Sequence, residues 1–328
     1  MITRRGFLTA AAASAAAGVG SKGALGATAA NGASHDPNLM VFLADIHMLD
    51  NSVRWPNGPT HQNALLQKFV KEILAMRPLP AHAVVFGDFS ASSGWEEDFA
   101  MAAKFLRPLA EAGIKLTLGM GNHDNRKNFL KTFPGYRKRM LLEDRIVSMA
   151  STPYADLIML DTLKTRDGDG WGEPTTSGNC VEGALDAAQR AWLRKTLASA
   201  TRPVFIGSHH LASEVGMVPE LVNGKTVYGH ILGHRHAFEE NFLHDGYSNS
   251  QTVQTVTLPS AGYWGDIGYA LFRTFPDRAE LTVRQTDFFF NREWADRPRP
   301  KNWLARVKLH DGAKVTFWYD KPGNFWKA

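Results

Sequence analysis

Five short segments of the chain concentrate carboxylates, imidazoles and one carboxamide at close spacing. They read D-I-H, G-D, G-N-H-D, S-H-H and G-H-R-H in chain order, and they begin at Asp45, Gly87, Gly121, Ser208 and Gly233. Oxygen and nitrogen donors of these kinds bind divalent first-row transition metals. A lone D-x-H or G-D pair occurs by chance in most chains of this length, but five such segments together predict a metal site.

Each of these segments follows an apolar run that is typical of a buried strand. The runs cover residues 39–44, 83–86, 114–118, 204–206 and 227–232. In an open α/β sheet, ligands bind outside the carboxyl ends of the strands. The five segments are therefore expected to converge on one site and to form a metal cluster there.

Strand-like and helical patterns alternate between residues 38 and about 290. Apolar residues recur at three- and four-residue spacing in three stretches, which predicts helices at 60–76, 95–112 and 186–200. Asp186 is placed to cap the last of these helices. Strand-like patterns predict an antiparallel edge or a second sheet at 252–258, 269–274 and 280–286. Residues 30–290 are therefore expected to form one α/β domain.

The order D-x-H, G-D, G-N-H-D, H-H and G-H-x-H resembles the signature of the calcineurin-like metallophosphoesterase superfamily. Members of that superfamily hydrolyse phosphate esters at a binuclear metal centre. Every signature segment is present, and the resemblance extends from Asp45 to His236. It implies an α/β fold in which a two-sheet β-sandwich is flanked by helices.

The resemblance also implies how the donors are shared between two metal ions. It assigns Asp45, His47 and His236 to the first ion, Asn122, His209 and His234 to the second, and Asp88 to both. A bridging carboxylate can give one oxygen to each of two ions about 3.5–4 Å apart. Two divalent or mixed-valence transition metal ions are expected as cofactors, and Mn, Fe, Zn and Co all suit this ligand set.

His123 is expected to act on the substrate without binding metal. By resemblance, its imidazole stabilises and protonates the leaving-group oxygen, and Asp45 orients the ring. An imidazole titrates close enough to neutrality for this task. A hydroxide that bridges the two metal ions would attack phosphorus in line. The predicted reaction is hydrolysis of a small phosphate mono- or diester.

Two further residues are candidates for contact with the substrate or for support of the metal ligands. Arg126 ends a G-N-H-D-x-R segment that resembles the bacterial cyclic-nucleotide phosphodiesterases of the same superfamily. It could hold a phosphate through its planar guanidinium, or it could be a solvated residue at a helix start. His210 follows His209 where many relatives have proline or a small residue. The sequence leaves open whether it contacts metal, substrate or neither, and we expect it behind the metal ligands.

Two alternative functions follow from these considerations. A cyclic-nucleotide-type phosphodiesterase is one alternative within the same reaction class. A non-catalytic protein-binding scaffold of the same fold is a more remote one, because such relatives usually lose metal ligands whereas this chain keeps all seven and His123. The phosphodiesterase and the scaffold would differ in the metal content of the protein and in the hydrolysis of phosphate esters.

The N-terminus resembles a twin-arginine export signal. Arg4 and Arg5 precede an Ala-rich uncharged run over residues 9–21, and residues 27–29 have the small-x-small form of a cleavage site. The apolar run is shorter than the roughly 20 residues that a membrane-spanning helix needs. We therefore expect residues 1–29 to be removed after export by the twin-arginine machinery, which leaves a periplasmic or extracellular protein without a stable membrane anchor.

Charge and cysteine content limit the class of partner and the source of stability. The formal net charge is +5, but Arg4, Arg5 and Lys22 lie in the predicted signal, and the mature chain carries only about +2. Nucleic acid is therefore not expected as a partner, since it binds clustered positive charge. The single Cys180 can form no intramolecular disulfide.

Residues 291–328, rich in Pro and Trp, are expected to pack on the domain as a C-terminal extension.

Overall fold

The computed structural model describes residues 34–50, 61–164, 183–244, 252–262, 264–289, 305 and 309–320. All of them belong to the unit Ala33–Ala328. The predicted export signal lies outside the described residues, as do the site of its cleavage and Cys180.

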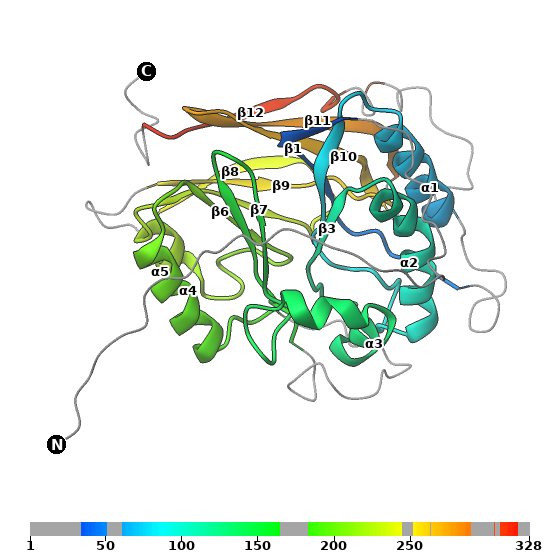
Figure 1. Cartoon of the computed structure of the whole chain (residues 1–328), viewed down its shortest axis with the longest axis horizontal. Coiled ribbons are helices and arrows are strands. Elements are labelled where there is room, and N and C mark those ends of the chain that lie inside the picture. The colour runs from blue at the N-terminus through cyan, green and yellow to red at the C-terminus, as the bar shows by residue number, and fades with distance from the viewer. Residues whose placement is uncertain are drawn as a thin grey trace, which may run out of the picture. The chain divides into compact units, whose positions relative to one another are not determined.

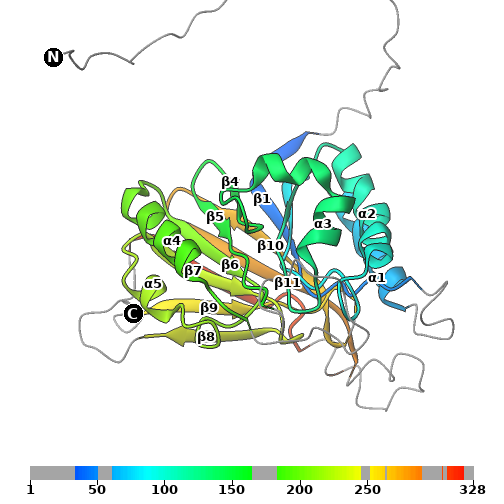
Figure 2. The same ribbon diagram turned by 90° about the horizontal axis from the view of Figure 1, so that it is seen from below.

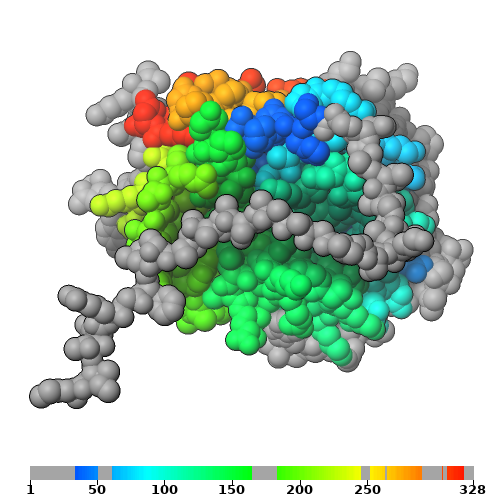
Figure 3. All heavy atoms as spheres, viewed as in Figure 1, coloured from blue at the N-terminus to red at the C-terminus, as the bar shows by residue number. Residues whose placement is uncertain are grey.

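A six-stranded sheet contains the first three strands of the chain. Its strand order is β12-β11-β10-β1-β2-β3. The strands are β1 (His35–Leu43), β2 (Leu79–Val85), β3 (Lys115–Leu118), β10 (Gly265–Thr274), β11 (Arg278–Phe289) and β12 (Lys314–Trp318). β1, β2 and β3 run parallel, whereas β10, β11 and β12 continue the sheet as an antiparallel half. Figure 3 shows these C-terminal strands in orange and red beside the blue β1.

A second six-stranded sheet contains the middle of the chain, in the order β4-β5-β6-β7-β9-β8. Its strands are β4 (Ser148–Ser151), β5 (Asp156–Met159), β6 (Val204–Ser208), β7 (Val227–Leu232), β8 (Glu239–Leu243) and β9 (Val253–Thr257). The four inner strands are parallel, and β4 and β8 pair antiparallel at the two edges. Parallel strands are buried on both faces, which is why they read as continuous apolar runs.

Aromatic side chains hold the two sheets face to face. Phe205 of β6 contacts Phe272 of β10 and Phe317 of β12, with ring centroids 4.9 and 5.2 Å apart. Within the first sheet, Phe42 of β1 stacks on Phe272 at 5.0 Å. Offset and edge-to-face ring pairs of this kind add packing energy beyond their buried area. Because Phe317 comes from the predicted extension 291–328, that part of the segment is built into the sandwich.

Helices cover the outer faces of both sheets (Figures 1 and 2). The first sheet carries α1 (His61–Leu74), α2 (Glu96–Glu111) and α3 (Arg126–Thr132), which is followed by the short 3₁₀ helix η1 (Pro134–Arg139). The second sheet carries α4 (Ala187–Ser199) and α5 (Val218–Val222). The predicted α/β sandwich flanked by helices is therefore confirmed.

Local sequence patterns placed three of these helices to within about two residues at each end. α1, α2 and α4 lie inside the predicted stretches 60–76, 95–112 and 186–200. Asp186 caps α4 as predicted, since its Oδ1 accepts a hydrogen bond from the Gln189 backbone N–H at 2.9 Å. Among the described residues, none of the helices combines the length and the apolar character needed to cross a bilayer.

Candidate metal centre

The loops after β1, β2, β3, β6 and β7 bring the predicted metal ligands together at one end of the sandwich. Contacts between residues far apart in the chain show this convergence. His236 Nε2 lies 3.4 Å from Asp45 Oδ1, and His209 Nε2 lies 3.3 Å from Asp88 Oδ2. His209 and His236 come from the second sheet, whereas both aspartates come from the first. The centre therefore forms where the two sheets meet.

One group of side chains contains Asp45, His47, Asp88 and His236. All four are buried, and one donor atom from each lies within 4.8 Å of the others, so the group could hold a metal ion. The Nε2 atoms of His47 and His236 are 3.3 Å apart, and His47 Nε2 is 3.5 Å from Asp88 Oδ2. This is the set that the sequence predicts for the first ion.

Backbone carbonyls decide which nitrogen each of these imidazoles presents. His47 Nδ1 faces the Ser90 carbonyl and His236 Nδ1 faces the Trp264 carbonyl, both at 3.1 Å. A carbonyl only accepts, so Nδ1 carries the hydrogen and Nε2 turns its lone pair toward the group. Burial lowers the pKa of His236 to about 3 and that of His47 well below its usual value, which keeps both rings neutral. Neutral, oriented imidazoles beside carboxylates fit a metal ion.

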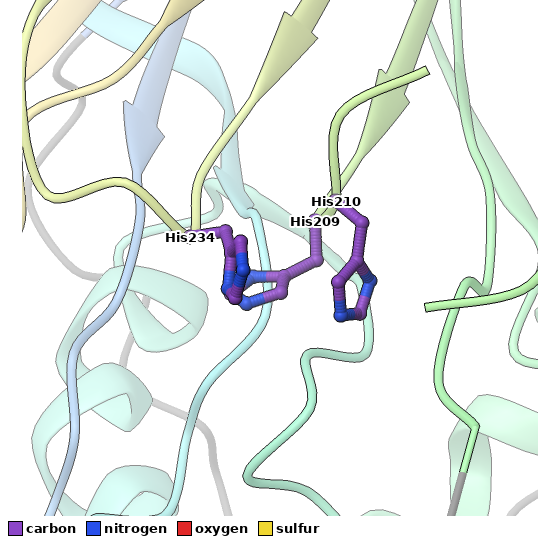
Figure 4. A group of neighbouring side chains, drawn as sticks. All are labelled: His209, His210 and His234. Carbon is purple, nitrogen blue, oxygen red and sulfur yellow. The ribbon is translucent and has the colours of Figure 1, made fainter. Parts of the chain in front are cut away.

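A second group lies on the other side of Asp88. Asn122 Oδ1 is 2.9 Å from His209 Nε2 and 3.0 Å from His234 Nδ1. His209 Nδ1 faces the Phe86 carbonyl at 2.8 Å, which directs Nε2 to the centre in the same way. Figure 4 shows the His209 ring directed toward His234, with His210 beside them, and these three imidazoles could hold a metal ion. Asn122, His209 and His234 form the set predicted for the second ion.

Asp88 lies between the two groups. Its Oδ2 is within 3.5 Å of both His47 Nε2 and His209 Nε2, and its Oδ1 accepts the His123 backbone N–H at 2.9 Å. Burial alone would raise the pKa of Asp88, but the neighbouring imidazoles, His209 foremost, outweigh it and hold the pKa well below its usual value. The carboxylate is therefore ionised in the position that a bridging ligand needs.

Backbone strain is concentrated on the predicted ligands. Five of them have positive φ angles: Asp45 at 53°, His47 at 42°, Asp88 at 52°, His234 at 70° and His236 at 53°. In the described part of the chain, these are all of the non-glycine residues with positive φ. A residue held in such a conformation costs about 1–3 kcal/mol and persists where surrounding contacts impose it, most often at functional sites. The strain is an indication of function that is independent of residue type.

His123 lies at the rim of the centre. Its Nδ1 is 2.9 Å from the Ser92 carbonyl, its Nε2 is 4.0 Å from Asp88 Oδ2, and its side chain is 21% exposed. The ring orientation thus comes from Ser92, whereas Asp45 was the expected partner. Asp45 instead accepts the His234 backbone N–H and approaches His236. The solvent contact of His123 suits a group that must meet a substrate.

Asp124 is a structural member of the centre to which the sequence analysis assigned no role. It is fully buried, and its carboxylate accepts backbone N–H groups of Phe89 at 2.8 Å, Ser90 at 3.2 Å and Gly121 at 2.9 Å. Burial and the Asp88 charge raise its pKa to about 7, against the effect of these donors. Its bonds tie the loop after β2 to the loop after β3. Asp124 is the last residue of the G-N-H-D segment, and that position in the motif could have identified it as part of the site.

The sequence suggested that Arg126 either holds a phosphate or lies in solvent at a helix start. In the structure its side chain does neither. It begins α3, but its side chain is 1% exposed, so it is not a solvated helix-start residue. Its guanidinium donates to both oxygens of Asp161 at 2.7 Å and to the Leu163 carbonyl at 2.7 Å. This bidentate pair joins the start of α3 to the end of β5 and indicates a structural role.

A cavity of about 460 Å³ adjoins the first group at His236. The Trp264 indole stacks on the His236 ring with centroids 4.6 Å apart, and it forms part of the cavity wall. Other lining residues include Arg235, Phe288, Phe289 and Leu309. The wall therefore combines aromatic and apolar surface with Arg235 and with the acidic residues Glu239 and Asp266, next to a predicted metal ligand.

Comparisons with known proteins support the fold. No protein-family model and no curated protein sequence matches the chain. The structure is similar to that of a dimetal phosphatase from Danio rerio, with a TM-score of 0.59 and 15% identity over 87% of this chain and 100% of that one. It is also similar to the structure of PhoD, with a TM-score of 0.51 and 12% identity over 78% of this chain and 67% of that one. These similarities confirm the expected fold, an α/β two-sheet sandwich flanked by helices.

Proposed function

We propose that the protein is an exported, binuclear metal-dependent phosphoesterase that hydrolyses small phosphate mono- or diesters. The observation that carries the proposal is the position of Asp88, whose Oδ2 lies 3.3 Å from His209 Nε2 and 3.5 Å from His47 Nε2. One carboxylate between two groups of ligand-type side chains is what a bridged pair of metal ions needs. The resemblance of the five sequence segments to the calcineurin-like superfamily supports the same assignment.

In such a reaction, different residues of the chain would bind each of the two metal ions. Bound metal ions would supply Lewis-acid activation of the phosphoryl group and of the attacking water. Asp45, His47 and His236 would hold one ion, with Asp88 shared. Asn122, His209 and His234 would hold the other. The backbone carbonyls that fix the rings of His47, His209 and His236 keep these donors in place before the substrate arrives, which lowers the cost of reorganisation.

His123 would protonate the leaving-group oxygen through Nε2. Its Nδ1 faces the Ser92 carbonyl, so Nε2 is the ring atom available for proton exchange. Its Nε2 lies 4.0 Å from Asp88 Oδ2, so the ring stands beside the carboxylate that the two metal ions would share. The predicted ligands other than His234 are buried away from bulk water, whereas the partial exposure of His123 leaves a path for the ester.

The cavity beside His236 suits the organic group of a small ester. Its aromatic and apolar wall, with Trp264 and Phe289, can bury a ring or a short apolar chain. The likeness of G-N-H-D-x-R to cyclic-nucleotide phosphodiesterases gains no further support here, because the guanidinium of Arg126 is paired with Asp161. The proposal therefore includes both phosphate monoesters and phosphate diesters as substrates.

The first experiment measures metal content and ester hydrolysis together. We expect about two metal ions per chain in the purified protein, with turnover of p-nitrophenyl phosphate or bis-p-nitrophenyl phosphate that rises when Mn is added. Asp88→Asn should lose both metal and turnover. Asp277→Asn, at an exposed carboxylate, should lose neither. A metal-free chain that hydrolyses neither ester under any loading would reject the proposal in favour of the scaffold alternative.

Export is tested separately from catalysis. The full chain with Arg4→Lys and Arg5→Lys should stay unprocessed in the cytoplasm, because the twin-arginine pair is the expected recognition element. The unaltered chain should appear shortened by about 29 residues outside the cytoplasm. Equal export of both forms would show that the N-terminus serves another purpose, and it would leave the hydrolase assignment untouched.

A further inference from the structure

His210 is a buried imidazole that the predicted ligand set does not include. Its relative exposure is 1%, so it cannot meet a substrate that enters from solvent. Thr162 Oγ1 lies 2.8 Å from its Nδ1. Its Nε2 is buried and has no hydrogen-bond partner among the described residues. A buried polar atom left without a partner costs about 1–3 kcal/mol, so this nitrogen needs an explanation.

The three imidazoles of the second group have the spacing of rings around one metal ion. The ring centroids of His209 and His210 are 4.9 Å apart, those of His210 and His234 are 4.9 Å apart, and those of His209 and His234 are 5.0 Å apart. Metal–nitrogen bonds of about 2.0–2.1 Å in a tetrahedral arrangement place ring centres about 5 Å apart. One nitrogen from each ring also lies within 4.8 Å of the other two (Figure 4).

The chain bends after β6 so that two neighbouring residues can serve one site. Successive side chains of a strand point to opposite faces, so His209 and His210 could not share a site if the strand continued. The Ser208 hydroxyl donates to the His210 carbonyl at 2.8 Å and stabilises the bend. Gly183 packs against the His210 ring, where a Cβ would lie 2.3 Å from Cγ. The ring is therefore held in its orientation toward His209 and His234.

We propose that His210 Nε2 is an additional ligand of the second metal ion, beside Asp88, Asn122, His209 and His234. This inference rests on the proposed binuclear centre. The second site would then have three imidazoles, whereas the first has His47 and His236 only. Imidazole-rich sites suit Zn, Fe and Co better than the oxygen-preferring Mn. The two sites should therefore differ in metal preference.

The test compares metal binding by the metal-free full-length chain and its variants. In a calorimetric titration with Zn²⁺, the unaltered chain should bind two ions. His210→Ala should weaken only one of them, by about 100-fold or more, because loss of even an outer partner of a ligand costs 10–100-fold. His35→Ala, at an exposed histidine, serves as the matched control and should bind both ions normally.

Each outcome bears on a different claim. Two ions bound by His210→Ala with unchanged affinity would overturn the role of His210 and leave the binuclear centre intact. No Zn²⁺ binding by the unaltered chain would overturn the centre itself. If His210→Ala does not fold, anomalous diffraction from the unaltered Zn²⁺-loaded protein decides. We expect His210 Nε2 at about 2.0–2.1 Å from the ion, and a position beyond hydrogen-bond distance would reject the inference.

Discussion

Among single residues, His123 is more exposed than the carboxylate next to it. Its side chain is 21% exposed, whereas that of Asp88 beside it is 2% exposed. A residue that binds metal is best kept away from water, but a general acid must touch the ester. The exposure of His123 and the fixed orientation of its ring by Ser92 together suit proton transfer rather than metal binding.

Replacing His123 separates these two roles. His123→Ala should retain about two metal ions per chain but lower kcat by about 10²–10⁴-fold, which is the usual contribution of a positioned acid or base. The loss should be smaller for esters whose leaving groups need no proton. Metal analysis and steady-state kinetics with good and poor leaving groups check this, with His35→Ala as control. An unchanged kcat would remove His123 from the mechanism.

At the scale of elements, the strand ends are held together by glycine as well as by side chains. The loop after β2 and the loop after β3 pack closely, and a Cβ on Gly121 would lie 2.1 Å from Asp88 Oδ1 and 2.4 Å from the Asp88 backbone nitrogen. Gly87, with φ of +89°, lies against Gly121 in the same way. Any side chain at these two positions would collide with the facing loop, so glycine is required there for a steric reason that a sequence pattern alone does not reveal.

Gly121→Ala should therefore damage the centre more than the fold. The added methyl group would displace the Asp88 carboxylate, so we expect lower metal occupancy and a loss of most turnover. Gly135→Ala is a matched control, because a Cβ at Gly135 meets nothing within 4 Å. Metal content and circular dichroism of both variants test the prediction. Full metal occupancy in Gly121→Ala would mean that the two loops separate easily.

The buried ion pair between α3 and β5 makes a second prediction at this scale. Arg126→Met should destabilise the protein by about 3–5 kcal/mol, because it leaves the Asp161 carboxylate buried without its partner. Arg126→Met combined with Asp161→Leu should recover part of the loss. Urea unfolding of the metal-loaded protein measures both. If Arg126→Met instead raised KM strongly without lowering stability, a phosphate clamp would be the better interpretation.

At the scale of the whole molecule, the metal centre joins the two sheets. Asp45, His47 and Asp88 follow strands of the first sheet, whereas His209 and His236 follow strands of the second. A ligand that binds only the folded state stabilises it, by about 4 kcal/mol at a thousandfold excess over Kd. Bound metal should also offset the strain of the five ligands with positive φ.

Removal of metal should therefore lower the stability of the entire sandwich. Treatment with a chelator should reduce the Tm of the unaltered protein, and added metal should restore it. The Tm of Asp88→Asn should respond little to either treatment, because that variant lacks the bridging carboxylate. Calorimetric melting curves of both proteins test this. An unaltered protein whose Tm is the same with and without metal would show that the centre does not hold the sheets together.

Short stretches of sequence were enough to predict the fold class, the main helices and the set of candidate ligands. These features are carried by neighbouring residues: apolar periodicity marks α1, α2 and α4, Asp186 caps a helix locally, and each donor-rich segment follows its own strand. The type of metal-binding side chain is likewise visible in a short motif. The fold is confirmed, and the metal-binding roles remain predictions to be tested.

How these groups meet depends on contacts that form only when the chain folds. Which ring nitrogen His47 presents depends on the Ser90 carbonyl, 43 residues away in the chain. The burial of Arg126 depends on Asp161, and the orientation of His210 depends on Thr162 and Gly183. Each is a contact between residues that are distant in sequence, and local propensity and periodicity carry no information about such partners. The pairing of neighbouring strands brings His47 to Ser90 and His210 to Thr162, and the packing of the two halves of the sandwich brings Arg126 to Asp161.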